Sequence, residues 1–175
     1  MMKRRVLIIF SLAFFAPFLW HCGYRFSSGE KVLKGYHRIY VDNFVNRTVQ
    51  ENLEMLFRNA FIDEVIRDGR LAIVTQKEGA DLIVAGEIKN VLSSPLAYRS
   101  GNWNAEQRLT VTLSLTLTER ESQKTLWQEE GFTYWVDYLV TPSGDVMGEQ
   151  NKQSALRKLA SEVSEKLYRL MFASF

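Results

Sequence analysis

Between residues 109 and 118, apolar and polar side chains alternate without a break. In a β-strand, successive side chains point to opposite faces of the sheet, so this pattern predicts a strand with one buried face. The other face is expected to meet water or a polar surface. Residues 126–140 predict a second long strand, bulged at Gly131, after a charged turn at residues 121–124. Together the two segments predict an antiparallel hairpin.

Two other segments repeat apolar residues at steps of three and four, the spacing that gathers side chains on one face of an α-helix. The first helix is predicted from a capping box at residues 48–51, which begins with Thr48, to about Arg67, with a stop at Gly69. The second is predicted from about Glu149 to Phe172. The predicted apolar faces consist of Val49, Leu53, Leu56, Phe57, Ala60 and Phe61, and of Leu156, Leu159, Ala160, Val163, Leu167, Leu170 and Met171.

Three shorter apolar segments, residues 37–44, 71–74 and 80–88, complete the predicted sheet. Pro95 and residues 100–102 indicate a long turn before the hairpin. The predicted order is therefore β-α-β-β-β-β-α. Because each helix has one apolar stripe and the hairpin has one apolar face, we predict an α+β fold. Its two helices pack on one face of a mostly antiparallel sheet of four to five strands.

The first residues have the pattern of an export signal. Lys3, Arg4 and Arg5 precede an uncharged apolar run at residues 6–20. This run is shorter than the roughly 20 residues that a membrane-spanning helix needs. We therefore predict a signal peptide at residues 1–21.

Cys22 is the only cysteine and directly follows the apolar run. Its position resembles a bacterial lipobox, in which the cysteine is lipidated and becomes the first mature residue, although His21 stands where lipoboxes have a small residue. We predict a lipidated tether at residues 22–35 and a single domain at residues 36–175. The alternative is an idle thiol behind an uncleaved anchor.

The charge balance and the residue types present argue against several classes of function. The chain has 22 Lys+Arg against 20 Asp+Glu, and the three basic leader residues leave 22 − 3 = 19 against 20. A body this neutral offers no field that would attract nucleic acid. His37 is the only histidine after the leader, so neither a zinc site nor a catalytic base is easy to build. We predict a non-enzymatic protein without a cofactor or metal.

Aromatic residues gather near the end of the hairpin. Trp103, Tyr134, Trp135 and Tyr138 are predicted partner-interface residues, because aromatic side chains are enriched in the centres of binding surfaces. The alternative is packing within the protein. Since residues 134–138 form one strand, Trp135 must face away from Tyr134 and Tyr138.

An ordered set of segments resembles the lipopolysaccharide-assembly lipoprotein (LptE) family. These segments are Cys22-Gly23-Tyr24-Arg25-Phe26 at the mature start, Ile39–Thr48 before the first helix, Ala80–Ile88, Leu126-Trp127 after a charged turn, and the closing amphipathic helix. The resemblance implies a lipoprotein that sits inside a large outer-membrane β-barrel, LptD, and helps it place lipopolysaccharide in the outer leaflet. It also implies outer-membrane localisation, which agrees with the absence of a retention aspartate at Gly23.

The resemblance further implies a direct contact with lipopolysaccharide through a basic residue on a loop at the sheet edge. Here that role falls on Arg99, with Arg108 as a weaker neighbour. A guanidinium can bind a phosphate at two points. The second basic position of some family members has no counterpart, since residues 141–148 contain no Lys or Arg.

Two other functions stay open. The chain could be the accessory lipoprotein of another envelope secretion or export channel, because such proteins use similar strands. A periplasmic binding or hydrolytic protein is a third reading, which the missing nucleophile and base disfavour.

Overall fold

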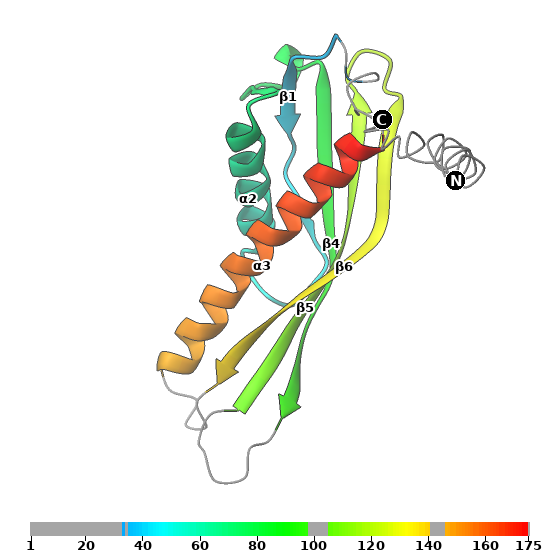
Figure 1. Cartoon of the computed structure of the whole chain (residues 1–175). Coiled ribbons are helices and arrows are strands. Elements are labelled where there is room, and N and C mark those ends of the chain that lie inside the picture. Colours follow the sequence, from blue (N-terminus) through cyan, green and yellow to red (C-terminus); the bar gives the residue numbers. More distant parts are fainter. Residues whose placement is uncertain (1–32, 34, 98–104, 141–145, 175) are drawn as a thin grey trace, which may run out of the picture.

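The computed structural model describes Leu33 and residues 35–97, 105–140 and 146–174. Figure 1 shows two helices lying together on one side of a long, twisted sheet. The elements in chain order are β1 (Arg38–Val41), β2 (Val45–Asn46), α2 (Leu53–Asp68), β3 (Ala72–Ile73), a short 3₁₀ helix η2 (Lys77–Gly79), β4 (Leu82–Ala97), β5 (Ala105–Glu119), β6 (Thr125–Val140) and α3 (Val146–Ala173).

The sheet has the order β3-β1-β4-β5-β6, and β2 pairs with β4 beside β1. The α+β class and the placement of both helices on one face are confirmed. The strand count and pairing differ from the prediction: the described sheet has six strands and is mixed. β4, β5 and β6 are antiparallel, whereas β1–β3, β1–β4 and β2–β4 are parallel. A helix between two strands returns the chain to its starting end, so β3 runs parallel to β1.

β4 is longer than the predicted segment at residues 80–88, because it continues through Pro95 to Ala97. β1 and β2 pair with β4 only as far as Ile88. Beyond that residue, β4 pairs with β5 alone among the described strands, so Pro95 lies in an edge strand, where a missing N–H is tolerated. Pro95 therefore does not end the strand.

The first helix starts later than predicted. Asn52, not Thr48, precedes the first helical residue, and its φ of 63° is left-handed. The Thr48 hydroxyl donates to the Asn46 side-chain oxygen at 2.8 Å, and Val49 is fully exposed. A polar turn stabilised by its own side chains thus replaces the predicted capping box. The predicted stop is confirmed: Gly69 has φ 75° and its N–H donates to the Val65 carbonyl at 3.1 Å.

One core joins the helices to the sheet. Leu33, from the predicted tether, is buried in this core. Leu170 was predicted on the apolar face of the second helix but is 41% exposed, because it lies outside the stripe of buried residues on α3. The large side chains that are most deeply buried are Ile39, Leu53, Phe57, Phe61, Leu82, Ile88, Leu109, Leu113, Leu115, Leu117, Leu156 and Tyr168.

Strand register defines the two faces of the sheet. Leu109 and Val111 are buried on the face that the helices cover, which we call the inner face. Thr110 and Thr112 point to the outer face, where no helix lies among the described residues. The predicted alternation over residues 109–118 is confirmed, and so is the bulge at Gly131, which has φ 77°. None of the described helices is long and apolar enough to cross a bilayer.

Candidate functional site

Three of the predicted functional residues lie outside the described residues: Cys22, Arg99 and Trp103. The structure places the other four, Arg108, Tyr134, Trp135 and Tyr138, in β5 and β6.

Arg108 forms a two-point ion pair with Asp137. Its Nε donates to Oδ1 at 2.8 Å and its Nη2 donates to Oδ2 at 3.0 Å. The hydrogen bonds from Arg108 lower the pKa of Asp137, and the same hydrogen bonds raise the pKa of Arg108. The two residues are cross-strand neighbours on the outer face. Arg108 is therefore already held by a carboxylate.

Trp135 lies beside this ion pair on the outer face. It pairs with Thr110, whose other neighbour is Leu92 of β4, so the three side chains form a row across β4, β5 and β6. Trp135 is 47% exposed, and the Arg108 Cζ lies 5.2 Å from the centroid of its ring. An exposed aromatic ring stacked on a paired arginine is a typical binding feature.

Tyr134 and Tyr138 belong to the inner face, as the alternation predicts, so they do not share one surface with Trp135. The Tyr138 hydroxyl donates to the Gln107 side chain at 2.8 Å. The Lys166 Nζ of α3 lies 4.8 Å from the Tyr134 ring centroid. A hydrogen bond to Glu162 raises the pKa of the Tyr134 phenol. Tyr134 and Trp135 are neighbouring residues of the edge strand. Although they belong to opposite faces, the centroids of their rings are 5.9 Å apart.

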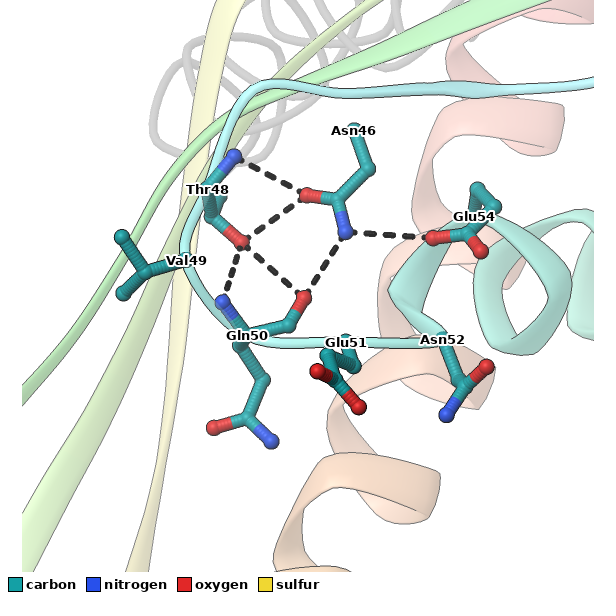
Figure 2. Close-up of a pocket in the computed structure, with 7 residues that line it drawn as sticks. All are labelled: Asn46, Thr48, Val49, Gln50, Glu51, Asn52 and Glu54. Carbon is teal, nitrogen blue, oxygen red and sulfur yellow. Dashed lines mark hydrogen bonds between the residues drawn. The ribbon is translucent and has the colours of Figure 1, made fainter.

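A polar pocket of about 530 Å³ lies where β2 leads into α2, and sequence reasoning missed it. Figure 2 shows Asn46 at its centre: the amide nitrogen donates to the Gln50 carbonyl at 2.8 Å and to Glu54 at 3.1 Å. The Asn46 oxygen accepts from the backbone N–H and hydroxyl of Thr48. These internal bonds satisfy the polar groups that they join, so the residues that line the pocket form a hydrogen-bonded turn. The spacing Asn46-Arg47-Thr48 is the sequence signal for it.

A second cluster, also unpredicted, ties the end of α2 to the end of α3. Arg70 donates to both carboxylate oxygens of Asp68, at 2.6 and 2.9 Å, and its Cζ lies 3.7 Å from the ring centroid of Phe172. The Tyr168 hydroxyl donates to Asp68 at 2.8 Å. Burial alone would raise the pKa of Asp68, but hydrogen bonds from Arg70 and Tyr168 outweigh it and lower that pKa. These contacts hold the end of α2 against the end of α3, and we call them the joint between the helices.

In the described part of the chain, no group of three or more His, Cys, Asp and Glu side chains could hold a metal ion. The features that remain for partner recognition are thus the exposed ring of Trp135 and the polar outer face around it.

A family model for lipopolysaccharide-assembly (LptE) proteins matches residues 36–171, well over half of the 175-residue chain. The chain belongs to the LptE family. Membership makes it an accessory lipoprotein of the cell envelope, from a non-enzymatic family that takes part in lipopolysaccharide assembly with LptD. A search of curated protein sequences found no significant match.

Solved structures share the fold. A protein from Xanthomonas campestris aligns with a TM-score of 0.53 at 12% identity, over 79% of this chain and 85% of the other. A minor lipoprotein from Acinetobacter baumannii aligns with a TM-score of 0.50 at 9% identity, over 79% and 94%. Rare lipoprotein B from Shewanella oneidensis gives a TM-score of 0.49 at 12% identity, over 79% and 96%. At these identities the first two similarities concern the fold alone, and the third supports no conclusion about this chain.

Proposed function

We propose that this LptE-family protein is an outer-membrane lipoprotein that assembles with the LptD β-barrel and occupies its lumen. In this position it assists the insertion of lipopolysaccharide into the outer leaflet. The observation that carries the proposal is the family match over residues 36–171, which spans nearly all of the described body. The earlier alternative, an accessory of another export channel, lacks such an observation.

The surface chemistry supports the proposed location inside a barrel. The lumen of an outer-membrane barrel is polar, whereas its outer wall is apolar. The outer face of β5 carries a ladder of hydroxyl side chains, Thr110, Thr112, Ser114, Thr116 and Thr118, all of them partly exposed. Such a face suits a polar wall better than a bilayer.

The proposed anchor is the lipid on Cys22. Leu33 is buried in the core, so the described body begins eleven residues after the cysteine, 33 − 22 = 11. A chain of that length reaches at most about 40 Å when fully extended. The lipid would therefore keep the body close to the membrane surface that it serves.

Direct contact with lipopolysaccharide is assigned to Arg99, with Arg108 as a weaker contributor. Arg108 is committed to Asp137, so a phosphate must compete with that carboxylate for its guanidinium. Replacing Arg99 by Asp should weaken lipopolysaccharide binding by the purified full chain and leave its thermal unfolding unchanged. Arg157→Asp, on the exposed side of α3, is the matched control. Equal binding by both variants would rule out the Arg99 contact.

The proposed partnership is tested by purifying the tagged, full-length protein from membranes extracted with mild detergent. Recovery of a single large β-barrel with the protein supports the proposal. Recovery of a ring-forming channel instead would favour the alternative accessory role. Depletion of the protein should also reduce lipopolysaccharide at the cell surface, measured by antibody labelling of intact cells.

A further inference from the structure

We propose that the outer face around Trp135 is the docking surface for the barrel partner, with Trp135 as its anchor. This inference rests on the proposed function and adds which face of the body meets the barrel wall. We call the set Leu92, Arg108, Thr110, Trp135, Asp137 and Leu139 the outer patch.

The strand register builds the outer patch from consecutive rows. Leu92, Thr110 and Trp135 form one row, and Arg108 and Asp137 stand together in the next. In the row after that, Leu139 pairs with Glu106. Directly opposed residues of antiparallel strands point to the same face, so the patch is continuous across three strands.

Three members of the outer patch are apolar and exposed: Leu92 at 55%, Trp135 at 47% and Leu139 at 51%. Exposed apolar side chains on one face, surrounded by polar residues, have the composition of an interface centre and its rim. The buried apolar residues of the same strands face the helices instead. The exposed ones are therefore available to a partner.

The Trp135 side chain is held in place before any partner arrives. Arg108 stacks on its ring at 5.2 Å, and Asp137 holds Arg108 at two points. A side chain that is already ordered loses little conformational entropy on binding, which favours affinity. Tryptophan and arginine are also the residue types that most often dominate binding energy.

The charges on the outer face favour a neutral protein surface as the occupant. Arg108 pairs with Asp137 and Arg47 pairs with Glu87, so an anionic lipid surface would have to compete with a carboxylate for each of these guanidinium groups. The β5 side chains between these pairs are Thr110 and Thr112, and Ser114 lies opposite Glu87. A strand wall with hydroxyl and amide side chains complements such a face, and a barrel lumen has that character.

The size of the outer face also fits a protein interface. A strand of 16 residues, such as β6, is about 50 Å long, and three strands spaced about 4.8 Å apart are about 14 Å wide. The resulting area of about 700 Å² is close to the roughly 800 Å² that each partner buries in a standard complex. No covering element on this face is found in the part of the chain that the structure describes.

The test compares barrel recovery by tagged, full-length variants after mild detergent extraction. Trp135→Ala removes the anchor, and Thr110→Arg places an unpaired charge in the same row. Ile66→Ala is the matched control, because Ile66 is 62% exposed on α2, away from the sheet. We expect both patch variants to recover at least about tenfold less barrel than wild type, and the control to match wild type. Thermal unfolding of the purified full chains should be equal, which excludes misfolding as the cause.

The outcomes separate this inference from the proposed function. If wild type recovers no barrel, the proposed function fails. If wild type recovers the barrel and both patch variants do so equally, only the docking surface is wrong. Loss of self-association in Trp135→Ala, measured by light scattering, would assign the face to a second copy instead. Loss of lipopolysaccharide binding with unchanged barrel recovery would assign it to lipid. Either result would overturn the inference.

Discussion

The ring of Phe44 packs directly against the backbone of Gly86. A β-carbon at residue 86 would lie 2.6 Å from Cδ2 of that ring, closer than real contacts allow. Phe44 lies between β1 and β2, and Gly86 lies in β4, so the contact fixes the first loop against the long central strand. Glycine at this position is thus explained by the close approach of a buried ring.

Gly86→Ala should destabilise the protein by about 1–3 kcal/mol, because the added methyl group overpacks the core at Phe44. Gly79→Ala is the control, since a β-carbon there meets no atom within 4 Å. Denaturant unfolding of both variants measures the difference. Equal midpoints would mean that Phe44 moves aside at no cost.

Asp81 should make stability depend on pH at the acidic end. A hydrogen bond from the Arg38 side chain, followed by one from the His37 backbone N–H, lowers the pKa of this carboxyl to about 2. The ionised carboxylate therefore stabilises the fold fully above its unfolded pKa of about 3.9, and this stabilisation disappears as pH falls through about 2.

Asp81→Asn should accordingly cost about 1–2 kcal/mol at pH 7, and the cost should shrink between pH 4 and pH 2. Denaturant unfolding at three pH values provides the measurement. A cost that stays constant over that range would show that the charge of Asp81 contributes nothing.

Tyr168→Phe should lower stability by about 1–2 kcal/mol. The variant removes the hydrogen bond from the buried Tyr168 hydroxyl to Asp68. Tyr40→Phe serves as the control, because Tyr40 is partly exposed and its hydroxyl has no hydrogen bond among the described residues. The thermal midpoints of the two variants should differ by several degrees. If they coincide, the joint between α2 and α3 does not depend on this bond.

Asn52→Ala should destabilise the protein by about 1 kcal/mol, whereas Asn52→Gly should have little effect. The φ of 63° is left-handed, which asparagine and glycine adopt more readily than alanine does. Both variants change the same exposed side chain, so their difference isolates the backbone. The opposite order of stability would contradict a left-handed residue at this position.

Cys22→Ser should abolish fatty-acid incorporation and release the protein from the membrane fraction. The reason is that each buried CH₂ of an acyl chain contributes about 0.8 kcal/mol of membrane affinity, and serine cannot form the thioether on which acylation depends. Labelling cells with an alkyne fatty acid, followed by fractionation, tests both effects. Continued labelling of the variant would place the lipid elsewhere in the chain.

The strands and helices could be predicted where spacing alone decides which side chains share a face. The alternation around Leu113 predicted the inner and outer faces of β5, and the stop at Gly69 was found from residue type. Thr48 was misread as a cap because its hydroxyl satisfies a local turn with Asn46 instead. A capping box and such a turn use the same residue types, so only the backbone distinguishes them.

The candidate site was predicted only in part. The separation of Trp135 from Tyr134 and Tyr138 follows from period-two geometry, and the structure confirms it. The pairing of Arg108 with Asp137, 29 residues apart, depends on the register of β5 against β6. That register is fixed by the bulge at Gly131, whose effect on alignment the sequence does not specify.

The sequence by itself determined the local periods, the turn at Gly69 and the alternating faces of the hairpin, because backbone geometry converts spacing directly into direction. The tertiary structure decided the parallel pairing of β1 with β4, the contact of Phe44 with Gly86 and the joint between Arg70 and Phe172. Each of these contacts joins residues that are distant in the chain. Which distant partners meet depends on how the whole core packs, and local spacing carries no information about that choice.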